Sequence, residues 1–337
     1  MDLIASLRNK IEALEVGDYV PGLKAVLLHI ETAFRHLSRG QETSDDTAFT
    51  DAIYRTNQAF EGSIKEAYRV LAGQDPSRKR PFDIENYLEN NSVFRIRVLD
   101  QFRTYRTGWR NPSAHDYNLD FDESEAFLAI VSVTAFACLL LNQIAERLSY
   151  LKSQAEAEVL KQTLSANLTA SKNADILSRT IDILRQFCAL HVHPSSSSAQ
   201  YTEVQSIGAL NGFFASVAPD LFVITEAILS PLSSDRHYRA DLLISRGDEK
   251  VIVELKCRLF NKNIQSAIAQ VERYMLISRI KNGIVLILPN TPSELEFREQ
   301  EVAEIYGRLA VLFPKKSKFS FQQITSDNSG TQTLSIE

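Results

Sequence analysis

Residues 238–256 read YRADLLISRGDEKVIVELK, and this stretch predicts two strands of a sheet in the C-terminal half of the chain. Apolar residues fill both arms, and the pair Gly247-Asp248 between them is typical of a hairpin turn. Asp241 stands near the start of the first arm, and Glu254 and Lys256 close the second. If the arms pair, these polar residues meet at one sheet edge, and Glu254 and Lys256 share a face because side chains alternate along a strand.

Asp241, Glu254 and Lys256 together predict a metal-dependent hydrolytic site. Two converging carboxylates form a hard oxygen site that suits Mg²⁺ or Mn²⁺. Such an ion polarises a phosphodiester and lowers the pKa of an attacking water. A lysine beside it can orient or deprotonate that water, or offset charge in the transition state.

The segments around the hairpin predict a mixed sheet flanked by helices. A helix at about 203–216 precedes an apolar strand at 221–225, and the two hairpin strands follow. A helix at about 263–278 then leads into a buried strand at 283–289, which ends at Pro289. The expected order is therefore helix, three strands, helix and strand, which is typical of an α/β architecture.

This pattern resembles the PD-(D/E)xK nucleases, and in detail their RecB-like branch. Asp241 is followed, after a spacer of 12 residues, by Glu254-Leu255-Lys256. The next helix carries Gln270-x-x-x-Tyr274, which is similar to the QxxxY signature of that branch. One departure is Ala240, which stands where the family's nominal proline would be.

The resemblance covers roughly residues 201–289 and implies a restriction-endonuclease-like α/β/α fold that cleaves nucleic acid, most often DNA. It further implies that Asp241 and Glu254 bind the metal and that Lys256 assists the water. Gln270 and Tyr274 would support the site or the DNA. Many members take a further acid from the first helix, and Glu203 is the best match for this metal ligand.

The N-terminal half predicts an all-α bundle. Apolar residues recur at three- and four-residue steps in 3–14, 23–37 and 49–71. A fourth helix is expected at about 84–107, and a long fifth helix starts near Asp122, where acidic residues suit the positive end of the helix dipole. The chain therefore divides into a helical domain and an α/β domain.

We place the domain boundary between 168 and 172, so that the helical domain comprises 1–168 and the nuclease domain 172–325. A helix at about 174–190 then belongs to the second domain. A boundary at 194–200, in the stretch rich in serine, is the alternative.

The turn before the long helix contains Arg110 and His115 around Pro112. Such a pair can cut RNA without metal, because imidazole takes the 2′-OH proton while guanidinium neutralises the phosphate. The spacing resembles the R-x4-6-H motif of the HEPN superfamily, and Asn111 matches the polar residue that follows the arginine. The resemblance spans about 20–150 and implies a dimer with a composite site.

Composition excludes several classes of protein. The formal net charge of -5 gives no overall attraction for nucleic acid, so a phosphate-binding surface has to be local. Three scattered cysteines and the lack of a signal-peptide pattern indicate a cytoplasmic protein with reduced thiols. The apolar run at 126–141 is shorter than the roughly 20 residues of a membrane span and predicts a buried helix. Neither GxxxxGK[ST] nor GxGxxG occurs, which disfavours ATP- or dinucleotide-driven chemistry.

The sequence thus predicts a HEPN-like bundle fused to a Mg²⁺- or Mn²⁺-dependent nuclease acting on DNA, with the bundle dimerising the chain, sensing RNA or cleaving it. Such a fusion resembles prokaryotic phage-defence effectors. Two alternatives stay open. One is a metal-independent RNase toxin that uses Arg110 and His115, and the other is a non-catalytic scaffold that binds nucleic acid.

Overall fold

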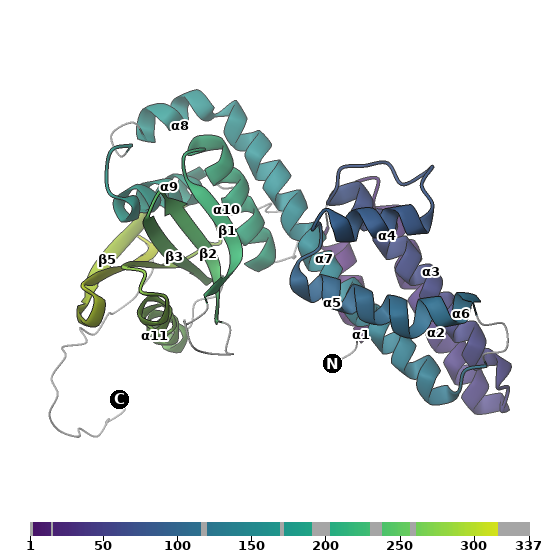
Figure 1. The fold of residues 1–337 in the computed structure, drawn as a ribbon. Coiled ribbons are helices and arrows are strands. Elements are labelled where there is room, and N and C mark those ends of the chain that lie inside the picture. The colour runs from purple at the N-terminus through teal and green to yellow at the C-terminus, as the bar shows by residue number, and fades with distance from the viewer. Residues whose placement is uncertain are drawn as a thin grey trace, which may run out of the picture.

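The computed structural model describes residues 3–14, 16–115, 120–168, 172–190, 203–229, 238–256 and 261–315. It has a helical N-terminal part and a C-terminal mixed sheet with helices. Figure 1 shows these parts as two lobes, with helix α7 (Glu123–Val159) running from one into the other. This confirms the α plus α/β class at the level of secondary structure.

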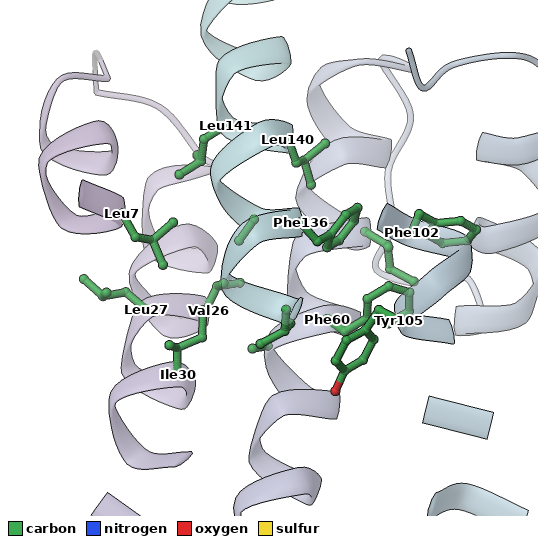
Figure 2. Close-up of a cluster of buried hydrophobic side chains, with 14 of the residues drawn as sticks. Leu7, Val26, Leu27, Ile30, Phe60, Phe102, Tyr105, Phe136, Leu140 and Leu141 are labelled. Atoms are coloured by element: carbon green, nitrogen blue, oxygen red, sulfur yellow. The ribbon is translucent and has the colours of Figure 1, made fainter. Parts of the chain in front are cut away.

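The helical part packs around α7. A capping box at Asp122 and Glu125 starts this helix, because each side chain bonds the backbone N–H of the other residue. Figure 2 shows Phe136 of α7 beside Phe60 and Phe102, whose rings lie 5.3 and 6.3 Å from it. The other helices of this part are α1 (Leu3–Glu12), α2 (Val20–Thr43), α3 (Thr47–Val70), α4 (Pro81–Asn90), α5 (Ile96–Tyr105), the π-helical turn η1 (Arg106–Arg110) and α6 (Asn111–His115).

The prediction of one helix at 84–107 is wrong, since the chain breaks between α4 and α5. Asn91 ends α4, and Ser92 takes a left-handed backbone conformation with φ of 51°. Asparagine and serine compete with helical hydrogen bonds through their own side chains, which favours a break. Phe94 then turns into the core, where it is buried against Phe102.

Helix α7 is long and apolar enough to cross a membrane by length and composition, and half of its most apolar 18-residue window is buried inside the protein. Residues Ala126 to Ile144 of this helix join the core of the helical part. Its later residue Ala157 joins a second core together with the C-terminal residues. Because α7 contributes to both cores, the boundary at 168–172 stays a prediction.

In the described part of the chain the sheet has six strands in the order β1-β2-β3-β4-β6-β5. The pairs β1–β2, β2–β3 and β5–β6 are antiparallel, whereas β3–β4 and β4–β6 are parallel. The strands are β1 (Phe222–Leu229), β2 (Tyr238–Arg246), β3 (Glu249–Lys256), β4 (Asn282–Ile287), β5 (Leu295–Val302) and β6 (Gly307–Pro314). The accompanying helices are α8 (Lys161–Leu168), α9 (Ile176–Leu190), α10 (Glu203–Val217), α11 (Asn261–Ser278) and the 3-10 turn η2 (Ala303–Ile305).

The expected order of helix, three strands, helix and strand is confirmed by α10, β1, β2, β3, α11 and β4. Strands β5 and β6 were not predicted. Strand β5 reads LEFREQEV and is an edge strand that pairs only with β6, so its middle is exposed and carries no apolar alternation. The apolar segment of β6 lies buried between β4 and β5.

The sheet separates two apolar layers. Val251, Val253 and Leu255 of β3 pack with α9 and α10, whereas Ile252 packs with α11 on the opposite face. Figure 1 shows α11 on one side of the sheet and α9 and α10 on the other. Because side chains alternate, Glu254 belongs to the face that α11 covers.

Two glycines of α10 allow this helix to pack closely against α7, where the two lobes meet. A Cβ atom on Gly208 would lie 2.2 Å from the carbonyl oxygen of Glu146, and one on Gly212 would lie 2.1 Å from that of Tyr150. Both distances are far below a normal contact, so only glycine allows these backbones to approach so closely. Helix α10, whose other side chains pack on the sheet, is thereby held directly against α7.

Candidate active site

The hairpin brings Asp241 and Glu254 together at the end of a strand ladder. The pairing of β2 with β3 ends at Leu242 and Val253, so Asp241 and Glu254 occupy the next positions in register. Beyond this point the backbone N–H of Leu255 donates to Oδ2 of Asp241 at 2.7 Å. A side chain thus replaces the missing ladder bond and holds the Asp241 carboxylate beside β3.

Glu254 is buried, with 4% of its surface exposed, and Lys256 lies next to it. Lys256 Nζ donates to Glu254 Oε1 at 2.8 Å, which confirms that the two side chains share a face. The second oxygen, Oε2, is buried without a hydrogen-bond partner among the described residues. A buried carboxylate oxygen with no partner is costly, and a cation is one group that could satisfy it.

Helix α11 places Gln270 and Tyr274 over this pair. Gln270 Nε2 donates to the Tyr274 hydroxyl at 2.7 Å, as expected for residues four apart on one helix. Burial raises the pKa of Tyr274, and the charge of Glu254 adds to this rise. The Gln270 amide opposes the rise that burial causes in the pKa of Glu254. The two residues of the QxxxY pattern therefore lie within electrostatic reach of the carboxylates.

Burial raises the pKa of Asp241 to about 7, and repulsion from Glu254 and Glu203 adds to the shift. The Leu255 N–H and Lys256 act in the opposite direction. Burial also raises the pKa of Glu254, although the hydrogen bond from Lys256 opposes this. The two acids therefore share a site where one proton is easily retained near neutral pH.

Burial by itself would lower the pKa of Lys256, but the hydrogen bond and charge of Glu254 and the charge of Asp241 raise it above its ordinary value. The ammonium group is accordingly charged at neutral pH. In this arrangement Lys256 is suited to orient a water molecule and to offset negative charge.

Among the described residues no group of three or more His, Cys, Asp or Glu side chains is placed to hold a metal ion. Glu203, at the exposed start of α10, therefore does not join Asp241 and Glu254 in a three-ligand set, and it acts on them only through its charge. A pair of carboxylates still fits Mg²⁺, which is often held by one or two carboxylates with water and substrate phosphates. The free Oε2 of Glu254 supports this fit.

The second predicted pair, Arg110 and His115, lies at the end of a helical segment. Arg110 closes η1, and His115 closes α6, whereas α7 begins only at Glu123. The sequence predicts a turn at this motif, whereas the structure has a π-helical turn followed by a short helix. Pro112 has no N–H for the carbonyl four residues earlier, and the π-turn before it, with its bond from Asn111 N–H to the Arg106 carbonyl, allows the helical path to continue.

The surroundings of Arg110 are acidic. Its guanidinium lies 3.9 Å from Glu61 and 4.0 Å from the buried Glu85, and it donates to Asn111 Oδ1 at 3.1 Å. Oε1 of Glu85 has no hydrogen-bond partner within the described chain. The side chain of His115 lies outside the described residues, so a joint site with Arg110 stays a prediction.

Two features beside the candidate site were not predicted from the sequence. Tyr238 packs edge-on against Tyr274 with ring centroids 6.1 Å apart. Glu226 of β1 has φ of 47°, and the β1–β2 pairing skips this residue and Asp241 opposite it. A positive φ at a glutamate carries no sequence signal, because glycine or asparagine is the usual residue there.

The chain was compared with protein-family models, with curated proteins and with solved structures, and no match was found in any of the three.

Proposed function

We propose that the C-terminal part is a metal-dependent nuclease of the PD-(D/E)xK type, acting on DNA. The observation that carries this proposal is the site at the end of the β2–β3 hairpin. Asp241 and Glu254 lie side by side, Lys256 is bonded to Glu254, and one buried oxygen of Glu254 has no partner in the described structure. Two acids that can hold a metal ion and a charged lysine are a set of groups suited to metal-dependent hydrolysis of a phosphodiester.

Asp241 and Glu254 would hold Mg²⁺ or Mn²⁺, which supplies Lewis acidity and lowers the pKa of the attacking water when bound. Lys256 would orient that water and balance charge on the phosphate, because its ammonium is kept protonated by the carboxylates. Gln270 and Tyr274, joined by their hydrogen bond, would hold Glu254 from the side of α11. Glu203 would raise the pKa of Asp241 and of Glu254 through its charge.

The finer fold assignments belong to the same proposal. We infer a restriction-endonuclease-like core, supported by a mixed sheet with α11 on one face and α9 and α10 on the other. We infer a HEPN-like bundle for the helical part, supported by its all-α content and its central α7. The role as a cytoplasmic phage-defence effector rests on this pair of resemblances alone.

Dimerisation through the helical part is a further element of the proposal. Large apolar side chains are exposed on several of its helices, and a second copy of the chain could cover such side chains. Among them are Leu28 on α2, Tyr54 on α3, Phe82 on α4, and Phe127 and Leu128 on α7. A dimer would bring two nuclease sites together and permit paired cuts.

Cleavage of supercoiled plasmid in Mg²⁺ or Mn²⁺ tests the nuclease. Asp241→Asn and Glu254→Gln keep the shape of each side chain and remove its charge. We expect the wild-type chain to nick or linearise the DNA and both variants to lose the activity by at least about 100-fold. Asp248→Asn, on the exposed turn of the same hairpin, is the matched control and should cleave like wild type.

Plasmid that stays intact with every preparation, while tRNA is cut in the presence of EDTA, would reject the metal-dependent site and favour the RNase that uses Arg110 and His115. The acidic neighbours of Arg110 speak against that alternative, because they already neutralise its guanidinium. Cleavage that neither the Asp241 nor a His115→Ala variant changes would point to a contaminant and to a non-catalytic scaffold.

A further inference from the structure

A cavity of about 310 Å³ lies at the junction of the two lobes, and its lining includes none of Asp241, Glu254 and Lys256. Its walls come from the start of α5, the middle of α7 and the neighbouring strands β1 and β2. Its volume is at the lower end of the roughly 300–1,000 Å³ that is typical of small-molecule sites. The lining residues are Arg95, Ile96, Arg97, Val98, Leu139, Asn142, Gln143, Thr225, Glu226, Ile228 and Arg239.

The cavity is locally positive in a protein whose net charge is -5. Three arginines and the carboxylate of Glu226 line it, and the carboxylate of Glu146 pairs with Arg95 from behind the lining. Arg97 is exposed and makes no hydrogen bond or ion pair with any described residue. An unpaired guanidinium at the rim of a cavity has all of its donors available for an anion.

The other two arginines are held in position by the junction itself. Arg95 bonds Glu146 of α7 and donates to Thr225 Oγ1 at 2.5 Å, and it also lies 3.3 Å from Glu226. Arg239 donates to Glu226 at 3.1 Å. A guanidinium group has five N–H donors, so the bond to Glu226 leaves Arg239 with donors for a ligand. Arg95 is used more fully, by Glu146, Thr225 and Glu226.

The start of α5 adds to the attraction for an anion. Ile96, Arg97 and Val98 form its first turn and all line the cavity. No side chain caps this end of the helix, so N–H groups of the first turn are not used by a cap. Phosphate groups bind well at such helix ends, where partial positive charge and free donors coincide.

The lining of the cavity also includes apolar side chains from three elements. Ile96 of α5 is 60% exposed and Ile228 of β1 is 50% exposed. Val98 of α5 and Leu139 of α7 complete the apolar part of the lining. Exposed β-branched side chains beside guanidinium groups suit a ligand that has both a charged end and a flat apolar part.

We propose that the junction cavity, lined by Arg95, Arg97 and Arg239 and by the apolar side chains of Ile96 and Ile228, binds a small phosphorylated ligand of the mononucleotide class. The phosphate would lie between Arg97 and the first turn of α5. The base would lie against the isoleucines. This binding is independent of the nuclease chemistry proposed above.

Isothermal titration of the full chain tests the proposal, with AMP, adenosine and inorganic phosphate as separate probes. EDTA is kept in every cell, so that no metal at Asp241 and Glu254 attracts the phosphate. We expect one AMP to bind per chain, and to bind more tightly than either adenosine or phosphate. If phosphate binds as tightly as AMP at the same arginines, the ligand of the cavity is free phosphate. That result would support the anion-binding part of the proposal and reject the contact with a base.

Two variants locate the ligand. Arg97→Ala removes an arginine with no partner in the described structure, so it should leave the fold intact and weaken AMP binding about tenfold or more. Ile228→Thr keeps a β-branched residue in β1 and should weaken AMP about fivefold, with phosphate binding unchanged. Arg78→Ala, at an exposed arginine between α3 and α4, is the matched control and should bind like wild type.

The proposal is overturned if none of the three probes binds at millimolar concentration, or if Arg97→Ala and Arg78→Ala bind alike. It is also overturned if AMP never binds while a single-stranded oligonucleotide does, with a loss in Arg97→Ala. In that case the arginines form part of a nucleic-acid surface. Each of these results is independent of whether the plasmid is cleaved.

Discussion

The carboxylate of Asp241 accepts a hydrogen bond of 2.7 Å from the backbone N–H of Leu255, the residue between Glu254 and Lys256. This bond ties the first acid of the candidate site to the backbone of the strand that carries the other two groups. It forms because the β2–β3 ladder stops at Leu242 and Val253, which leaves the next N–H free. The positions of Asp241, Glu254 and Lys256 are thus fixed by the two strands of the hairpin and not by a loop.

Metal binding should stabilise the wild-type chain in a pH-dependent way. Mn²⁺ at about a hundredfold excess over its Kd should raise Tm by on the order of 5 °C at pH 8. The rise should be much smaller at pH 5.5, because the pKa of Asp241 is raised to about 7 and a cation has to displace its proton. Differential scanning fluorimetry with EDTA as the reference measures this. Equal shifts in wild type, Asp241→Asn and Glu254→Gln would contradict it.

Without metal, Asp241 should make stability fall as pH rises. Its pKa is about 7 in the folded chain and roughly 3.9 when unfolded, so the folded state holds the extra proton between these values. Its contribution is fully present below about pH 4 and is lost as pH rises through 7. Asp241→Asn removes the ionisation, and its stability relative to wild type should rise by at least about 1 kcal/mol from pH 4 to pH 8.

Urea unfolding in EDTA at these two pH values provides the measurement. Asp248→Asn, on the exposed turn of the hairpin, should show no such change. A difference between Asp241→Asn and wild type that is the same at both pH values would show that the buried carboxyl is not the titrating group.

Lys256 should matter for turnover more than for metal binding. Lys256→Gln removes the cation but can still donate to Glu254, so we expect a loss in kcat of about 10²–10³. The Mn²⁺-dependent rise in Tm should remain, because both carboxylates are kept. Single-turnover cleavage together with the thermal shift separates the two effects. A loss of both would instead assign Lys256 to the support of the metal site.

The glycine contact between α7 and α10 should be intolerant of any side chain. A Cβ atom at Gly208 meets the Glu146 carbonyl oxygen at 2.2 Å, so Gly208→Ala forces the helices apart and should cost about 1–3 kcal/mol. Gly108→Ala, in the π-turn, meets nothing within 4 Å and should be neutral or slightly stabilising. Urea unfolding of both variants tests this, and equal midpoints would refute the close contact.

We expect the helical part not to cleave RNA, because acidic side chains surround Arg110. Glu85 and Glu61 lie about 4 Å from its guanidinium and offset the charge that a phosphate would need. Tyr105, which directly precedes this segment, is fully buried and its hydroxyl bonds Thr56 and Asn57 of α3. These contacts fix the segment to the core of the helical part. Incubation of tRNA with EDTA is the test, and cleavage that Arg110→Ala abolishes would reverse this expectation.

Several parts of the fold could be read from the sequence because the relevant information is local. Gly247-Asp248 with apolar arms specifies a hairpin, and two-residue alternation places Glu254 and Lys256 on one face. The four-residue spacing of Gln270 and Tyr274 likewise specifies their contact on α11. The sequence prediction was wrong where the local preference for a helix is weak. Asn91 and Ser92 break the helix that was expected at 84–107.

Contacts between distant segments were decided only by the tertiary structure. The close approach of Gly208 to Glu146, and the links from Arg95 to Thr225 and Glu226, join residues that no sequence period relates. The raised pKa of Asp241 likewise depends on burial beneath other elements. Sequence alone determined which side chains could form a metal-dependent site, because strand and helix periods are local properties. Only the packed chain decided their burial, their charge state and the cavity at the junction, because desolvation and long-range pairing arise when distant segments meet.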